Sequence, residues 1–194
     1  EYGALRHDQL TVMASVTDSY GVVSAPVLRG AYSLRVSCSA NGNAATTGEL
    51  VVVGWRTVAS AGQTWSSAAQ AGFITAGFRG RLKQRFLNSA ASQLASAQAD
   101  GTGATSSSRL TVQGQVAPAN TAYVELDVAL YLDSAGAGAV GSAHFDDLVL
   151  LNEATIPAGV VDGDRGNARW DLQPYLSLSS SLGEEEDFEA MLDW

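Results

Sequence analysis

Two adjacent carboxylates, Asp146 and Asp147, are well placed in this chain for binding a cation. They follow Phe145 in an alternating stretch that predicts a strand over residues 140–151. Because successive side chains of a strand face opposite ways, at most one of the two carboxylates is expected to be a ligand. The alternative is a solvated edge, where Asp147 accepts hydrogen bonds from loop amides.

A second predicted strand has a basic residue at every second position. These residues are Arg79, Arg81, Lys83 and Arg85. Leu82 and Phe86 fall on its opposite face, so the pattern predicts a cationic strand surface. Such a surface could hold an anionic glycan, an acidic neighbouring subunit or the acidic tail of another copy. It could equally be a solvated face that resists edge aggregation.

The sequence offers little that could carry catalysis. His7 and His144 are its only histidines, and it has no nucleophile elbow, zinc-protease motif or phosphate-binding loop. Paired carboxylates that hydrolyse glycosides stand several ångströms apart across a cleft, unlike two sequential residues of a strand. We therefore expect a protein that is not an enzyme, with His144 serving as a strand residue.

Composition narrows the class of protein further. The net charge is −9, but six of the 20 acidic residues lie in the last eleven positions, so the body offers no dominant cationic surface for nucleic acid. The lone Cys38 excludes an intrachain disulfide and is expected to be buried. No apolar run or leader pattern predicts membrane insertion. Because Glu1 is not a natural translation start, we expect the chain to be a fragment or a cleaved product.

Alternating apolar residues predict about eight to ten strands and little helix. The predicted strands cover residues 10–16 (with 22–25 as a continuation), 32–38, 49–54, 64–71, 79–86, 94–98, 109–116, 122–130 and 140–151. This pattern indicates an all-β antiparallel sandwich. We assign residues 1–153 to this domain, and residues 154–194 to an extension.

The extension holds a linker at 156–159, an Asp-Gly-Asp…Trp segment at 162–170, and an acidic end. The spacing of Phe188, Met191 and Leu192 predicts a short amphipathic helix, which is too short to be stable alone. We expect it, with Trp194, to pack on a partner. Asp162-Gly163-Asp164 lacks the glutamate of a calcium loop, because position 173 is Gln, and so it predicts a turn.

The order of four segments, GAYSLRV, AGQTWSSAAQ, APANTAYVELDVAL and AHFDDLVL, resembles the galactose-binding-like jelly rolls that serve as carbohydrate-binding modules. The resemblance covers residues 1–152, and none of its motifs is catalytic. A shorter resemblance starts at Asp162. There, DGDRGNARWDLQPYLSLSSS is similar to the segment that follows such modules in minor tail proteins of phages infecting actinobacteria.

The jelly-roll resemblance implies two kinds of site. In similar modules a glutamate near the N-terminus and an Asp of the Phe-Asp-Asp motif bind a structural Ca²⁺, which points to Glu1 with Asp146 or Asp147. Sugar binding needs flat aromatic faces beside polar groups. The candidates are Trp55 with Arg56, and Tyr2, Tyr20 and Tyr131. Trp65 and Tyr32 match core positions of similar modules.

Together the two resemblances imply a non-catalytic jelly-roll module in a virion tail. Its role would be adhesion to host-surface glycans, packing of the tail tip against other virion proteins or copies of itself, or both. One alternative is a structural virion protein that makes only protein contacts. Another is the accessory carbohydrate-binding module of a secreted glycoside hydrolase.

Overall fold

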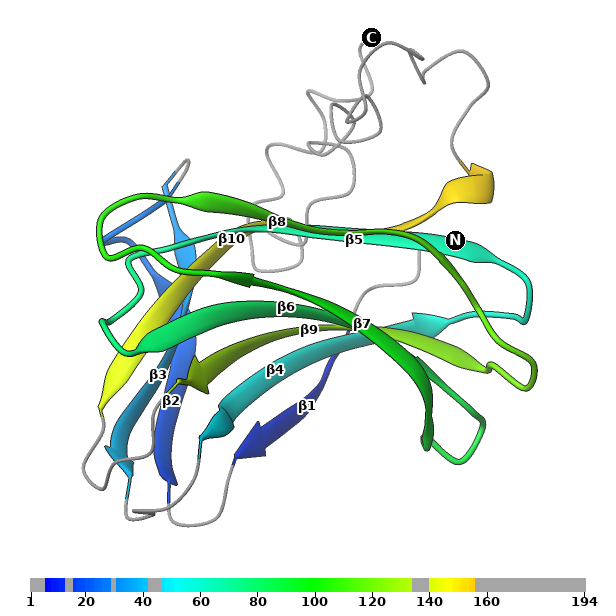
Figure 1. Ribbon diagram of the computed structural model, residues 1–194, viewed down its shortest axis with the longest axis horizontal. Coiled ribbons are helices and arrows are strands. Elements are labelled where there is room, and N and C mark those ends of the chain that lie inside the picture. Colours follow the sequence, from blue (N-terminus) through cyan, green and yellow to red (C-terminus); the bar gives the residue numbers. More distant parts are fainter. Residues whose placement is uncertain (1–5, 13–15, 29–30, 42–46, 134–139, 156–194) are drawn as a thin grey trace, which may run out of the picture.

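The protein is a sandwich of two antiparallel five-stranded sheets (Figure 1). The computed structural model describes residues 6–12, 16–28, 31–41, 47–133 and 140–155. Sheet A has the strand order β1 (Arg6–Val12), β4 (Gly48–Val58), β9 (Tyr123–Leu132), β6 (Phe78–Leu87) and β7 (Gln93–Gly101). Sheet B has the order β2 (Val16–Val23), β3 (Ser33–Asn41), β10 (Gly141–Asn152), β5 (Thr64–Gly72) and β8 (Ser108–Val116).

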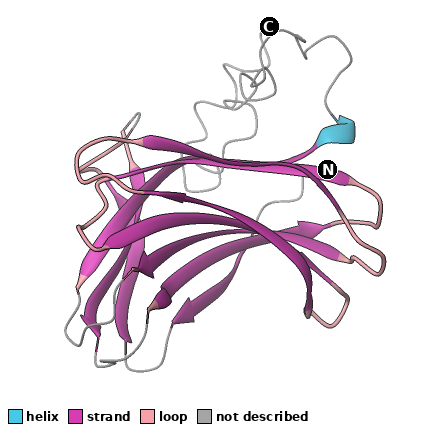
Figure 2. Ribbon diagram, viewed as in Figure 1, coloured by secondary structure: helices cyan, strands magenta, loops and turns pink. Residues whose placement is uncertain are grey.

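The predicted all-β sandwich is confirmed, since strands dominate the described chain (Figure 2). Its one helical element is the short 3₁₀ turn η1 (Glu153–Thr155). The prediction was wrong at the N-terminal end, where residues 10–16 were expected to form one strand that continues at 22–25. Instead β1 and β2 divide that region and pair into different sheets. Within the described residues, no helix is long and apolar enough to span a membrane.

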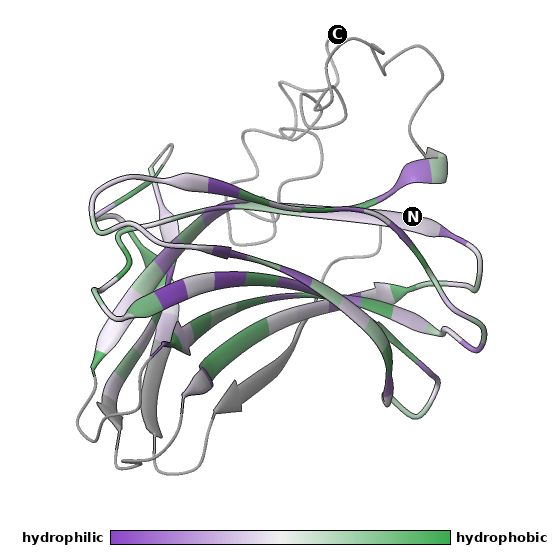
Figure 3. Cartoon of the chain, viewed as in Figure 1, coloured by the Kyte–Doolittle hydropathy of each residue, from purple (hydrophilic) through white to green (hydrophobic). Residues whose placement is uncertain are grey.

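Alternation along each strand builds the core between the sheets. On β9 the even-numbered residues from Val124 to Leu132 are buried in this core, and the odd-numbered ones face outward. On β6, Leu82 and Phe86 point inward while the four basic residues point outward, as predicted. The ribbon of this strand accordingly carries purple, hydrophilic bands among paler and green ones (Figure 3). The outer face of sheet A is therefore polar.

Three expectations about single core residues have mixed outcomes. Cys38 and Trp65 are buried, as predicted. Tyr32 is 48% exposed, so its assignment to the core was wrong. The strand β3 begins one residue later, at Ser33, and Tyr32 lies outside the ladder that places Leu34 and Val36 in the core.

The expected alternation at the acidic pair does not hold. A β-bulge shifts the pairing of β10 with β5 between Asp146 and Val149, and Asp147 has a positive φ of 46°. As a result Phe145 and Leu148, three residues apart, both lie in the core. Asp146 still pairs with Gln70, and the shifted segment begins at Asp147, so strict alternation no longer fixes the relative directions of the two carboxylates.

Candidate functional site

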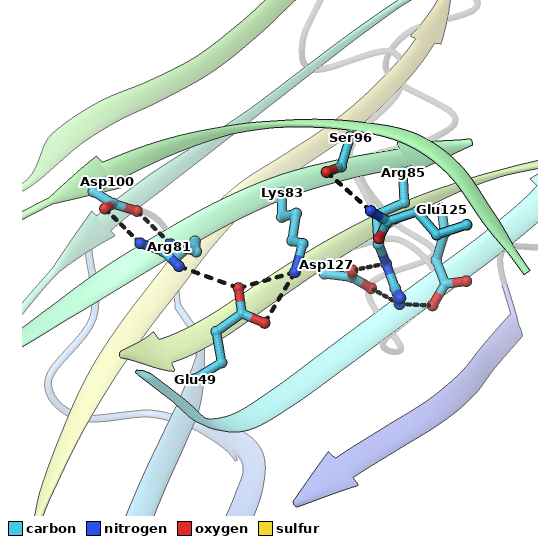
Figure 4. A network of polar contacts seen from close by, with 9 residues as sticks. Glu49, Arg81, Lys83, Arg85, Ser96, Asp100, Glu125 and Asp127 are labelled. Atoms are coloured by element: carbon cyan, nitrogen blue, oxygen red, sulfur yellow. Dashed lines mark hydrogen bonds and ion pairs between the residues drawn. The ribbon is translucent and has the colours of Figure 1, made fainter. Parts of the chain in front are cut away.

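The outer face of sheet A carries an array of charged side chains from four adjacent strands (Figure 4). Strand register sets their order. Glu125 of β9 lies directly between Arg56 of β4 and Arg85 of β6, and Asp127 lies between Gly54 and Lys83. Directly opposite residues of neighbouring strands bring their side chains into contact.

Glu125 is the centre of the first cluster. Arg56 donates from Nε (3.0 Å) and Nη2 (2.8 Å) to Glu125 Oε2, and Arg85 Nη2 donates to Oε1 (2.8 Å). Arg85 also forms an ion pair with Asp127, with Nε 2.6 Å from Oδ2. The side chains of Glu125 and Asp127 are each 1% exposed, whereas those of Arg56 and Arg85 are 17% and 21% exposed. The carboxylates thus lie underneath and the guanidinium groups lie toward solvent.

Burial changes the acid–base behaviour of this cluster. Loss of solvent contact, opposed by the charge of Arg85 and reinforced by that of Glu125, raises the pKa of Asp127 to about 7. Burial by itself would lower the pKa of Arg85, but the negative charges of Asp127 and Glu125 outweigh it and raise this pKa. Near neutral pH, therefore, Asp127 is divided between its protonated and ionised forms while Arg85 stays charged.

Gly54 provides the space that the two carboxylates occupy. A Cβ at this position would clash with Asp127 Oδ1 and would lie 2.8 Å from Glu125 Oε1. A strand residue with any side chain would push both groups away from β4. Gly54 is therefore part of the site, although it has no functional group.

A second cluster lies further along the same face. Arg81 donates two hydrogen bonds to Asp100 of β7, from Nε to Oδ1 (2.7 Å) and from Nη2 to Oδ2 (2.8 Å). The hydrogen bonds that Asp100 accepts from Arg81 lower the pKa of Asp100. Lys83 Nζ lies 3.0 Å from Glu49 Oε2, and Arg79 Nε lies 2.6 Å from Asp133 Oδ1.

Carboxylates of the same face neutralise the predicted cationic surface. Each of its four basic residues pairs with one or more carboxylates from β4, β7, β9 or the residue after β9. These acids are Glu49, Asp100, Glu125, Asp127 and Asp133. Sequence reasoning identified the basic stripe but did not assign these partners. The acidic residues at alternate positions of residues 123–133 were the available signal.

Two tyrosines of β9 lie on this face, each with a guanidinium over its ring. Arg56 Cζ lies 5.5 Å from the ring centroid of Tyr123, and Arg81 Cζ lies 3.9 Å from that of Tyr131. Both rings are half-buried. Tyr131, a predicted sugar-binding residue, therefore belongs to the same face as Arg56, while Tyr123 was missed by the sequence analysis.

The structure separates the other predicted sugar-binding residues. Trp55 is 2% exposed and packs in the core, so its assignment as a stacking platform was wrong. Its neighbour Arg56 faces outward because the two alternate on β4. Tyr20 lies on β2 of the other sheet and is exposed. Tyr2 lies outside the described residues, as do the predicted partner-binding residues Phe188, Met191, Leu192 and Trp194.

The proposed calcium ligands are only partly described. Asp146 is buried, and its Oδ1 accepts a hydrogen bond from the backbone N–H of Asp147 (2.8 Å). Glu1 lies outside the described residues. Among the residues that are described, no three His, Cys, Asp or Glu side chains form a group that could hold a metal ion. The described carboxylates do not make a Ca²⁺ site by themselves, and bound Ca²⁺ stays a prediction.

His144 is a buried strand residue, as expected. Its Nδ1 lies 3.2 Å from Ser33 Oγ, and its ring packs edge-on against Phe73. Burial, together with the positive charge of Arg35, lowers its pKa. His144 thus lies in sheet B, on the other side of the sandwich from the charged array.

Comparison with known proteins gives a likeness of fold. No known family matches the sequence, and no curated protein does either. Among solved structures, the C-terminal family 22 carbohydrate binding module of Clostridium thermocellum Xyn10B is similar, with a TM-score of 0.52 and 14% identity over 77% of this chain and 90% of that one. A carbohydrate-binding module of the β-sandwich superfamily, studied for promiscuous specificity, gives 0.50 and 10% identity over 74% and 57%.

A phage protein also appears among the similar structures. The enzymatically active domain of bacteriophage CBA120 tailspike protein 4 has a TM-score of 0.45 and 12% identity over 73% of this chain. This chain spans only 18% of that protein, and the likeness is too weak to carry an argument. At these identities the comparisons establish a fold shared with β-sandwich carbohydrate-binding modules.

Proposed function

We propose that the protein is a non-catalytic glycan-binding module and that the outer face of sheet A is its binding surface. The observation that carries this proposal is the placement of Tyr123 and Tyr131 on one face with a fixed array of polar side chains. Each ring has a guanidinium over one of its faces, so a sugar would pack its apolar side on the face or edge of the ring that the guanidinium leaves open. The charged groups around the rings can bind the hydroxyls of the sugar.

The array is suited to binding because it is already ordered. The buried carboxylates of Glu125 and Asp127 hold Arg85 in place, and Asp100 and Glu49 hold Arg81. Groups that are fixed before the ligand arrives lose less conformational entropy on binding. Tyr123 and Tyr131 are eight residues apart on β9, which separates them by about 27 Å. An extended saccharide chain could therefore lie along the strand.

Affinity electrophoresis against a panel of soluble polysaccharides tests this proposal. We expect retardation by one or more of them, and we expect Tyr131→Ala to weaken it. The matched control is Tyr20→Ala, which removes an exposed tyrosine from sheet B. Equal loss of retardation in both variants, or no retardation of the parent protein, would contradict the assignment of this face.

We also propose that the module serves in a virion tail, where it contributes to adhesion or to assembly. This setting is supported only by the two sequence resemblances in series, at residues 1–152 and from Asp162 onward. Binding of the purified chain to actinobacterial cell walls would support adhesion. The accessory module of a secreted hydrolase is the alternative, and a catalytic domain in the flanking reading frame would favour it.

If the protein is instead a purely structural virion protein, a different experiment tests its role. If the acidic end docks on a partner, deleting residues 183–194 should abolish tail assembly and leave the sandwich folded. Normal assembly of the truncated protein would argue against that role.

Bound calcium is a separate proposal, supported by the position of Asp146 and Asp147 at the start of the bulge of β10. Thermal unfolding with excess Ca²⁺ and with EDTA tests it. A rise in the unfolding temperature that is lost in Asp147→Asn would support a structural ion. Identical curves in the two buffers would contradict it.

A further inference from the structure

We propose that Arg56 and Arg85 together bind the carboxylate of an acidic sugar, so that the module prefers glycans that contain uronic acids. The inference rests on the proposed function, because it specifies the ligand class of the same face. It follows from the way in which one buried carboxylate, Glu125, fixes two guanidinium groups side by side.

The geometry leaves one edge of each guanidinium unused. Arg56 engages Glu125 through Nε and Nη2, and Arg85 engages Glu125 and Asp127 through Nε and Nη2. Within the described part of the chain, neither Nη1 atom has a hydrogen-bond partner. Both side chains are partly exposed, so these N–H groups can meet a ligand. Two guanidinium edges directed at one carboxylate give strong charge-assisted hydrogen bonds.

The charge of the cluster also favours an anion. Arg56 and Arg85 carry two positive charges and Glu125 carries one negative charge. With Asp127 protonated, the four groups have a net charge of +1, and with Asp127 ionised they are neutral. Burial of Asp127 favours its protonated form. In that form Asp127 carries no negative charge to balance the positive charge of the two guanidinium groups.

The other basic side chains of β6 are each paired with a carboxylate, so they add no unpaired cation beside Arg56 and Arg85. Lys83, which lies opposite Asp127 on β6, is paired with Glu49, and Arg81 is paired with Asp100 and Glu49. Arg79 is paired with Asp133. Among the basic residues of β6, the preference for an anion is therefore confined to Arg85, beside Arg56 of β4. Arg6 of β1 lies directly opposite Arg56 in the strand register and would add positive charge at the same end of the face.

The surroundings favour a sugar over an acidic peptide. Tyr123 lies beside Arg56, and the exposed Ser96 and Gln98 of β7 add a hydroxyl and an amide on the side of Arg85. Aromatic, hydroxyl and amide groups around a carboxylate-binding pair match a ring that carries both hydroxyls and an acid. An acidic peptide offers the charge but not the hydroxyls.

Three probes separate these possibilities. They are polygalacturonate, its fully methyl-esterified form, and poly-glutamate of similar length, each titrated into the intact chain in EDTA at fixed ionic strength. We expect polygalacturonate to bind about tenfold or more tightly than the ester, because the ester removes the charge and keeps the sugar backbone. We expect poly-glutamate to bind more weakly than polygalacturonate.

Matched variants locate the site. Arg56→Gln should lower the affinity for polygalacturonate by about tenfold and leave that for the ester nearly unchanged. Arg35→Gln makes the same charge change at an exposed position of β3 in sheet B, and it should behave as the parent protein. Asp127→Asn keeps the shape of the cluster and removes its titratable charge, so polygalacturonate should bind more tightly than to the parent at pH 8.

Several results would overturn the inference. Equal binding of polygalacturonate and its ester would do so while leaving glycan binding intact. Poly-glutamate that binds as tightly as polygalacturonate would indicate a general anion site instead. Arg56→Gln and Arg35→Gln with the same affinity would remove the site from sheet A. Failure to bind any polysaccharide, acidic or neutral, would contradict the proposed function as well.

Discussion

At the scale of single residues, Gly54 determines whether the charged cluster can form. We expect Gly54→Ala to destabilise the fold by about 1–3 kcal/mol, because its Cβ would displace the carboxylates of Glu125 and Asp127. Urea unfolding measures this loss. Gly21→Ala is the control, since a Cβ at Gly21 meets nothing within 4 Å and Gly21 also lies in a strand. Equal effects of the two substitutions would contradict the role of Gly54.

Asp127 gives the fold a dependence on pH. Its pKa is raised to about 7 in the folded protein, above the unfolded value of about 4, so the folded state binds more protons between these limits. The contribution of Asp127 to stability is then largest below pH 4 and is lost as the pH rises toward 7. Asp127→Asn should remove this dependence. The slope of the unfolding free energy against pH should change by the equivalent of up to about one bound proton.

Urea unfolding of both proteins at intervals from pH 4.5 to 7.5 checks this prediction. The stability of the parent should fall with rising pH relative to that of Asp127→Asn. Parallel stability curves for the two proteins would mean that Asp127 is ionised throughout the range.

The sequence predicted that the four basic residues of β6 face outward, but it did not predict which carboxylates pair with them. The positions of Arg79, Arg81, Lys83 and Arg85 follow from alternation alone, whereas the contact between Arg56 and Glu125 joins residues 69 apart. Which strands become neighbours is decided by the whole fold. The importance of Gly54 follows from the same pairing, because it lies opposite Asp127.

At the scale of elements, the register of β4 decides the role of Trp55. With Arg56 facing outward, Trp55 must face the core, and truncation there should cost stability and not only binding. We expect Trp55→Ala to lower the free energy of unfolding by about 3–5 kcal/mol. Trp55→Phe should cost less and should keep the glycan affinity of the parent. Loss of binding by Trp55→Phe with full stability would instead support a stacking role.

The strand β6 contains ion pairs of unequal importance. Lys83 and Glu49 are both about one-fifth exposed, so Lys83→Met should change stability by less than about 1 kcal/mol. Arg85→Met removes the counter-charge of two carboxylates that are 1% exposed and should cost about 3 kcal/mol. Thermal or urea unfolding of the two variants compares them directly. Similar losses would show that burial does not distinguish the pairs.

The strands themselves were largely predictable. From residue 64 onward every predicted strand lies within or beside an observed one, because alternating apolar residues mark them clearly. The N-terminal region was harder, since residues 10–16 include the end of one strand and the start of another that belong to different sheets. The bulge at Asp146 has no signal in the apolar pattern.

At the scale of the whole molecule, the two sheets have different outer faces. The outer face of sheet A has an ion-paired array with two tyrosines, whereas that of sheet B includes the small buried cluster Ala68, Val149 and Leu151. The sequence predicted the sandwich but not which face would be functional, because that depends on strands distant in sequence. The assignment of residues 154–194 to a separate extension stays a prediction.

We propose that glycan binds to the outer face of sheet A. The most direct test is an NMR titration of the labelled protein with the saccharide that binds best. We expect shifts in the arginine Nε–H signals of Arg56 and Arg85 and in the backbone signals of β4, β6 and β9, with those of β3 unchanged. Shifts confined to sheet B, or saturating binding without any shift in sheet A, would contradict it.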